Sequence, residues 1–356
     1  MKKTIAFLLC AVMLLTLCAC GNSSAPASEA PSAGSADQAP AADAPKGDPI
    51  EIKLTTTDPT GCPTVLALEA CAEEIYERTD GMVDIQVYAD GQMLVYAEGV
   101  EAMMSNANLI LVATPSYLVD YVPVLSTLVS PYLFSSREVA AAFFDSEYFQ
   151  GIRQECIDAG FYCICCDGLI GYRSVYASEP VHSVADLRKL SLRISSGDVF
   201  VKLFSSMGCN YTVMSFSDVF NALQTGAIDG LECVPLTVTA NSLYDAKSPM
   251  YYSRTNHILD CYGMWVGYEF WSSIPEEYRE IIDEVLGNWG KVATAACVEQ
   301  EETEIYPAYA DHDVTVVDLT EEELAEFRAY GEQVVLEQER GDEVLAAIKA
   351  VEDSLG

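Results

Sequence analysis

Asp186 to Pro235 is the stretch that decides the fold, DLRKLSLRISSGDVFVKLFSSMGCNYTVMSFSDVFNALQTGAIDGLECVP. Short apolar runs alternate in it with longer helical patterns, and glycines separate them. The pattern predicts strands over Leu190–Ile194, Tyr211–Met214 and Ala227–Glu232, a helix over Val199–Met207, and a second helix from Ser217 as its N-cap to Gly226.

Arg193 is the residue of this stretch that best suits a binding role. It alternates with the apolar Leu192 and Ile194, so it faces the other side of its strand, and a Ser-Ser-Gly turn follows. A guanidinium offers a planar two-donor fork that matches a carboxylate. Arg193 is therefore a candidate carboxylate clamp. Taken alone, an arginine in a strand also suits a surface ion pair.

The stretch resembles the signature region of the solute-binding proteins of tripartite ATP-independent periplasmic (TRAP) transporters, the DctP-like family. The phrases LRKLSLRISS, MSFSDVFNALQTGAIDG and LEC-x-P carry the resemblance. EEIYERTDGMVDIQVYADGQM, SPYLFSS and GMWVGYEFWSSIPEEYREII extend it along the chain. The resemblance implies an α/β fold like that of periplasmic binding proteins, with two lobes, a ligand cleft between them and a long helix that spans both.

The resemblance also implies a set of ligand-binding residues. Arg193 would clamp a carboxylate, Arg173 in a G-x-R match would point to the ligand, and Phe216 would pack on its carbon skeleton, unless it is a core residue. Cys233 stands where the family has the asparagine of E-N-P, with Glu232 before it. Because a thiol is a weak donor and acceptor, Cys233 favours a more apolar or differently shaped ligand.

The N-terminal part of the body predicts further candidates. Strands over Ile50–Thr55 and Val83–Tyr88, with a helix over Cys62–Thr79 between them, predict a parallel pair. Leu109–Val112 predicts another strand. Ligands of open α/β sheets lie outside the carboxyl ends of strands, which makes candidates of Thr57, Asp58, Thr114 and Ser116. Turn and cap chemistry explains these four residues equally well.

The C-terminal part continues the α/β pattern. It predicts a strand over Phe161–Asp167, a turn over Gly168–Arg173, a strand over His257–Tyr268, a helix from Pro275 to about Tyr306, a strand over Val314–Asp318 and a capping box at Thr320. Arg173 and Arg193 are expected on adjacent strands. The expected lobes are 49–170 plus 259–298 and 171–258 plus 299–356.

The N-terminus is typical of an exported lipoprotein. Lys2 and Lys3 precede an apolar run over Ile5–Leu17 that ends in Leu-Cys-Ala-Cys. We expect a signal peptide over residues 1–19, a lipid anchor on Cys20 and a disordered linker over 20–48, rich in Ala, Pro, Ser and Gly. The localisation expected is extracytoplasmic and lipid-anchored to the cell membrane.

Charge and cysteines restrict the partners. Removing Lys2 and Lys3 takes the net charge from −35 to −37, which argues against nucleic acid and keeps an exported protein soluble. The Cys163–Cys166 cluster CICC lies in an apolar run without paired metal-ligand spacing, which favours small buried cysteines over a disulfide or a metal site. No cofactor is expected.

The function expected is capture of a small organic acid and its delivery to the membrane subunits of an ion-coupled TRAP permease. A ligand-sensing lipoprotein that serves a membrane receptor is the alternative that the sequence leaves open. A hydrolase is disfavoured because no GxSxG, HExxH or nucleophile–histidine set is found. An ABC-type binding protein is disfavoured by ALQTGAIDG.

Overall fold

The computed structural model describes residues 47–195 and 197–356. The predicted signal peptide over 1–19, the anchor residue Cys20 and the linker up to residue 46 lie outside the described residues. Within the described ranges, every helix is too short or too polar to cross a bilayer.

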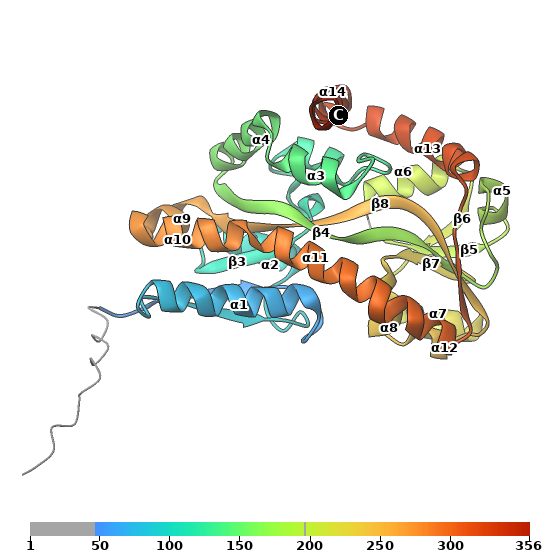
Figure 1. The fold of residues 1–356 in the computed structure, drawn as a ribbon, viewed down its shortest axis with the longest axis horizontal. Helices are drawn as coiled ribbons and strands as arrows, with labels where there is room; N and C mark the ends of the chain where they lie inside the picture. Colours follow the sequence, from blue (N-terminus) through green and yellow to red (C-terminus); the bar gives the residue numbers. More distant parts are fainter. Residues whose placement is uncertain (1–46, 196) are drawn as a thin grey trace, which may run out of the picture. The chain divides into compact units, whose positions relative to one another are not determined.

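Strands and helices alternate along most of the chain (Figure 1). The strands are β1 (Ile50–Thr55), β2 (Val83–Tyr88), β3 (Leu109–Ala113), β4 (Phe161–Ala177), β5 (Ser191–Ile194), β6 (Asn210–Val213), β7 (Gly230–Cys233), β8 (Met250–Gly267) and β9 (Val314–Val317). The α-helices are α1 (Pro63–Arg78), α2 (Tyr96–Met104), α3 (Arg137–Phe144), α4 (Glu147–Asp158), α5 (Val184–Leu187), α6 (Asp198–Ser206), α7 (Val219–Thr225), α8 (Pro235–Ala240), α9 (Tyr268–Ser273), α10 (Glu276–Gly287), α11 (Trp289–Gln300), α12 (Tyr306–Asp311), α13 (Glu321–Leu336) and α14 (Gly341–Leu355). The 3₁₀ turns are η1 (Pro115–Leu118), η2 (Pro123–Val129), η3 (Phe216–Asp218) and η4 (Leu243–Asp245), and η5 (Glu301–Ile305) is a π-helical turn.

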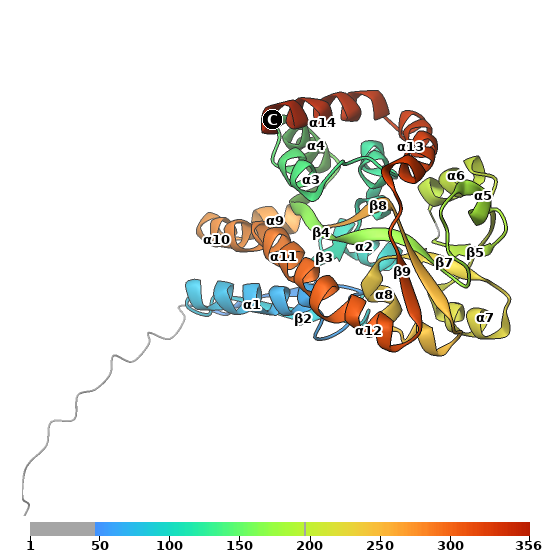
Figure 2. The ribbon, with the colours of Figure 1, turned by 45° about the vertical axis from the view of Figure 1, so that its right-hand side comes forward.

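One mixed sheet joins all the described strands in the order β2-β1-β3-β8-β4-β7-β5-β6, with β9 paired to β8. β1 runs parallel to β2 and β3, which confirms the predicted β-α-β unit. β5 runs parallel to β6 and β7. The long antiparallel pair β4–β8 joins these two groups of strands, as Figure 2 shows from a second direction.

The turn predicted over Gly168–Arg173 is wrong, because β4 continues through it to Ala177. Gly168 and Gly171 instead lie within the bulged strand β4, where neighbouring side chains pack directly against the backbone. A Cβ atom on Gly168 would lie 2.5 Å from the Trp289 ring, and one on Gly171 would lie 2.8 Å from the Glu301 carboxylate. The predicted adjacency of the Arg173 and Arg193 strands is also wrong, since β7 lies between β4 and β5.

The helix predicted from Pro275 to Tyr306 is interrupted. α10 ends at Gly287, Asn288 separates it from α11, and the π-helical turn η5 carries α11 into α12. Helix α11 lies along β4 (Figure 1). The Thr320 capping box and the left-handed Gly226 (φ 73°) are confirmed, but no side chain caps α7, so the N-cap prediction for Ser217 is wrong.

The core lies on both faces of the sheet because neighbouring strand residues alternate. Cys163 packs with α3 and α4, whereas Ile164 packs with α1 and α10 on the opposite face. All ten cysteines of the described residues are free thiols and eight are buried, which confirms the prediction of small buried side chains. The sheet therefore positions the site residues on a rigid frame.

Candidate ligand-binding site

The side chains of Leu192 and Ile194 pack in the core on one face of β5. Arg193 lies between them in sequence, so its side chain points to the opposite face. Only 7% of Arg193 is exposed. Its Nε atom donates to the carbonyl of Met214 at 3.3 Å, and its guanidinium lies 5.6 Å from the ring centre of Phe216. No carboxylate of the described residues lies within 4.0 Å of it, so Arg193 is a buried cation without an anionic partner.

Arg173 on β4 is, by contrast, fully paired. Its Nε and Nη2 atoms donate to the carboxylate of Glu232 at 2.6 and 3.0 Å. Its Nη1 atom donates to Asp260 at 2.8 Å, and its guanidinium lies 5.1 Å from the ring centre of Phe200. Burial works against the charge, but the two carboxylates raise the pKa of Arg173 well above its usual value. Its charge is therefore neutralised within the protein.

Ser195 connects the two arginines, and sequence reasoning missed it. Its Oγ atom accepts from Arg173 Nη2 and from Arg193 Nη1, each at 3.1 Å, and its amide donates to Glu232 at 3.0 Å. The Ser-Ser-Gly turn after β5 was the available signal. We call Arg173, Arg193, Ser195, Glu232 and Asp260 the arginine cluster.

Glu232 is completely buried at the centre of the arginine cluster. Burial alone would raise the pKa of its carboxyl, but Arg173 and His257 together hold that pKa well below the usual range. His257 Nε2 lies 3.7 Å from Glu232, and its Nδ1 pairs with the hydroxyl of Thr255 at 2.9 Å. Burial lowers the pKa of the His257 imidazole, and the neighbouring Glu232 carboxylate opposes that shift.

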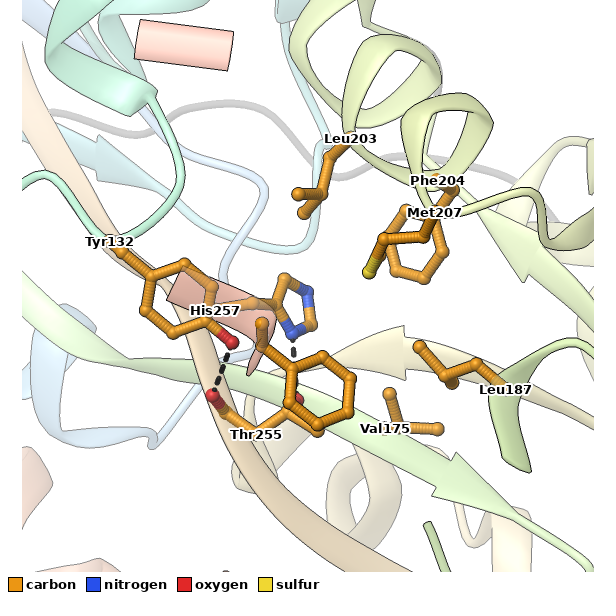
Figure 3. Close-up of a pocket in the computed structure, with 9 residues that line it drawn as sticks. Tyr132, Val175, Leu187, Leu203, Phe204, Met207, Thr255 and His257 are labelled. Atoms are coloured by element: carbon orange, nitrogen blue, oxygen red, sulfur yellow. Dashed lines mark hydrogen bonds between the residues drawn. The ribbon is translucent and has the colours of Figure 1, made fainter. Parts of the chain in front are cut away.

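His257 also lines a small apolar cavity, shown in Figure 3. Tyr132, which donates to the carbonyl of Thr255 at 2.8 Å, closes one side, and Leu203, Phe204 and Met207 of the α6 segment close the other. The walls of this cavity are mainly apolar, so it is a packing defect of the core.

Segments that follow the N-terminal strands carry acidic and aromatic side chains, Asp58 after β1 and Tyr117 after β3. Asp58, which follows β1, is half-buried and accepts a hydrogen bond from Thr64. Burial raises the pKa of Asp58 to about 6, and the charge of Asp260 adds to the rise. Tyr117 is 39% exposed, and its partial burial raises the pKa of its hydroxyl to about 12, with contributions from Tyr96 and Asp260. The sheet register brings the ends of these strands to one edge, since Thr55 of β1 lies opposite Leu111 of β3, and Ala113 of β3 lies opposite Gly263, three residues after Asp260 on β8.

The rings of Tyr96 and Tyr117 lie 5.4 Å apart, and both are exposed. Tyr96 has a positive φ of 52°, unusual for a bulky residue. Neither tyrosine was predicted as a site residue, because a lone tyrosine in a loop carries no spacing signal.

The remaining predicted residues lie in other surroundings. Thr114 and Ser116 hydrogen-bond each other, and Thr114 accepts from the amide of Ser116 as the cap of η1. Cys233 points to the opposite face of β7 from Glu232 and packs in the core with Tyr176 and Tyr252. Burial raises the pKa of its thiol to about 12. The structure thus brings together Arg193, Arg173, Phe216 and Glu232, and adds Ser195 and Asp260.

A sequence profile described as bacterial extracellular solute-binding protein, family 7 (DctP) matches residues 54–341. The C4-dicarboxylate-binding periplasmic protein DctP of Rhodobacter capsulatus is 26% identical over 293 residues, 78% of this chain and 84% of that protein. A solute-binding protein of Chromohalobacter salexigens is 27% identical over 234 residues, 65% of this chain and 69% of its own length.

Solved structures share the fold. A TRAP periplasmic solute-binding protein of Desulfovibrio salexigens, in complex with diglycerolphosphate, matches 86% of this chain and 98% of its own, with a TM-score of 0.78 and 23% identity. A TRAP periplasmic solute-binding protein of Actinobacillus succinogenes, with bound L-galactonate, matches 84% and 99%, with a TM-score of 0.75 and 23% identity. The α/β architecture with two lobes is therefore confirmed.

Proposed function

Because this chain belongs to the bacterial extracellular solute-binding proteins of family 7, we propose that it binds a small organic acid through Arg193 and delivers it to a TRAP permease. Proteins of this family bind solutes outside the cytoplasm, so binding rather than catalysis is the activity that we propose. The relatives set the class of ligand only broadly, since the ligands of these proteins include a dicarboxylate, sugar acids and glycerol phosphates.

The lack of an anionic partner for Arg193 is the observation that carries this proposal. A buried charge without a partner is costly, and proteins keep one only where something else compensates it. Arg193 is 7% exposed, is held by Met214 and Ser195, and has no carboxylate of the described residues within 4.0 Å. An incoming carboxylate would supply the missing charge in a two-donor geometry.

Arg173 has a different role in this proposal. Glu232 and Asp260 already occupy most of its donors, so it fixes Ser195 rather than binding the ligand alone. Phe216 lies against Arg193 and would cover one side of the ligand. Glu232 keeps Arg173 in place and does not bind the ligand.

Anchoring and transport complete the proposal. A lipid on Cys20 would tether the body to the outer face of the cell membrane through the linker up to residue 48. Closure of the expected lobes, 49–170 plus 259–298 and 171–258 plus 299–356, would bury the ligand, and the permease would bind the closed form.

A thermal-shift screen of residues 48–356 against organic acids and neutral sugars tests this function. A ligand that binds the folded protein raises its melting temperature, and we expect shifts with acids and none with neutral sugars. Arg193→Ala should abolish the shift. Arg328→Ala, at an exposed ion pair with Glu321, is the matched control and should keep it. Shifts with neutral sugars alone would contradict the proposal.

A further inference from the structure

Asp260 of the arginine cluster and Asp58 after β1 are two carboxylates on the side of the N-terminal strands. Asp260 on β8 is 9% exposed, and only its Oδ2 atom accepts a hydrogen bond from the described residues, from Arg173 at 2.8 Å. Asp58 after β1 is half-buried and accepts from Thr64. Both carboxyls therefore keep acceptor capacity that the described residues leave unused. We call Asp58 and Asp260 the acidic pair.

Asp260 lies within reach of a small molecule held at Arg193, and Asp58 follows β1 at the same edge of the sheet. Three hydrogen bonds in series connect the two ends: Arg193 to Ser195 at 3.1 Å, Ser195 to Arg173 at 3.1 Å, and Arg173 to Asp260 at 2.8 Å. A molecule of a few carbons could therefore place its carboxylate at Arg193 and its other end beside Asp260. Tyr117 lies in η1, directly after β3, at the same edge of the sheet.

The charges of the site restrict what that far end can be. Arg173 and Arg193 bring two positive charges, whereas Glu232, Asp260 and Asp58 bring three negative ones. The raised pKa values of Asp58 and Asp260, caused mainly by burial, indicate surroundings that already disfavour negative charge. A second carboxylate on the ligand would lie against like charges, whereas a hydroxyl or an ammonium would donate to them.

We propose that the acidic pair is the second recognition point of the site and selects acids with one carboxylate and hydrogen-bond donors at the other end over dicarboxylates. The inference rests on the proposed function and narrows it. Hydroxyl groups and an ammonium group share the donor chemistry that Asp58 and Asp260 recognise. The acidic pair thus rejects the second anion of a diacid while it accepts a polyhydroxy or amino acid.

Calorimetric titration with acids matched in chain length tests this selection. Succinate, 4-hydroxybutanoate and 4-aminobutanoate share four carbons and differ at one end, and galactarate and L-galactonate form a six-carbon pair. At pH 7.5 we expect at least one acid that carries a donor at its far end to bind about tenfold or more tightly than the diacid of equal length. Comparison of the affinity for 4-aminobutanoate with the affinities for the hydroxy acids shows whether the preferred donor is an ammonium or a hydroxyl.

Variants of the acidic pair give the second measurement. Asp58→Asn and Asp260→Asn should reduce the preference over the diacid to about threefold or less, and 4-aminobutanoate should lose more affinity than 4-hydroxybutanoate if the donor is an ammonium. Asp120→Asn, at an exposed side chain, is the matched control and should keep the preference. If Asp260→Asn fails to fold, Asp58→Asn still decides, because Asp58 takes no part in pairing Arg173.

Equal or tighter binding of the diacids, or no binding of any acid with a donor at its far end, would overturn the selection. If a diacid binds tightly to the wild type and does not bind to Arg193→Ala, Arg193 still binds a carboxylate. Only the proposed role of the acidic pair would then be wrong. Binding of any acid that is unaffected by Arg193→Ala would overturn the proposed function itself.

Discussion

Arg173 and Arg193 donate to the same atom, the Oγ of Ser195, each at 3.1 Å. Two guanidiniums approach one neutral oxygen only because Glu232 and Asp260 neutralise Arg173. Arg193 is thereby left as the charge that a ligand can compensate.

Ser195→Ala should weaken acid binding by less than about tenfold, because its hydroxyl would add at most one hydrogen bond of its own to the ligand, worth about 1 kcal/mol. A ligand carboxylate is a stronger acceptor than the hydroxyl and would take over its contacts with the arginines. Calorimetric titration of an acid from the screen checks this, with Ser206→Ala, whose hydroxyl donates to the Leu203 carbonyl, as the control. Loss of binding as complete as in Arg193→Ala would mean that Ser195 itself holds the ligand.

Glu232→Gln should lower the free energy of unfolding by about 3 kcal/mol or more, because it removes the carboxylate that pairs with the buried Arg173. The lowered pKa of Glu232 means that this stability is present above the usual glutamate pKa and is lost as the pH falls. Urea denaturation at pH 7.5 and pH 3.5 measures both effects.

Glu321→Gln, at an exposed ion pair with Arg328, is the control for Glu232→Gln and should match the wild type. If both glutamate variants have the same stability, the arginine cluster contributes nothing to the fold.

Asp58 should make the protein less stable as the pH rises. Its pKa is raised from 3.8 to about 6 in the folded protein, so the folded state holds the proton more tightly than the unfolded chain. The stabilisation is complete below pH 4 and is lost as the pH rises through 6. The melting temperature of Asp58→Asn should therefore exceed that of the wild type by a margin that grows between pH 4 and pH 7.

Asp120→Asn controls for the general effect of removing an exposed carboxylate in that series. If the difference in melting temperature between Asp58→Asn and the wild type stays constant with pH, the pKa of Asp58 is not raised in the folded protein.

The sequence predicted local elements better than the contacts between them. β1 and β2 have the predicted bounds because their patterns end at turn residues. β4 was cut short because Gly168 suggested a turn, although it is a glycine to make room for the Trp289 ring. That contact joins residues more than a hundred positions apart, and no local pattern contains it.

Part of the site was predictable because a local sequence motif contains it. Arg193 and Arg173 stood out through the family motif, and Glu232 through its place beside them. Asp260 pairs with Arg173 only through the bulged register of β4 and β8, in which Gly171 lies opposite Asp260 and Arg173 opposite Ile258. Ser195 was interpreted only as a turn residue. Neither register nor shared acceptors can be derived from spacing along one chain.

Titration calorimetry of Arg193→Ala against wild type, with the acid that gives the largest thermal shift, tests the central claim most directly. We predict a loss of affinity of about 100-fold or more, since hydrogen bonds to charged groups contribute about 1.5–3 kcal/mol each and Arg193 would make two. The far-ultraviolet circular dichroism spectrum should be unchanged. Binding by a folded Arg193→Ala protein with wild-type affinity would contradict the assignment of Arg193 as the carboxylate-binding residue.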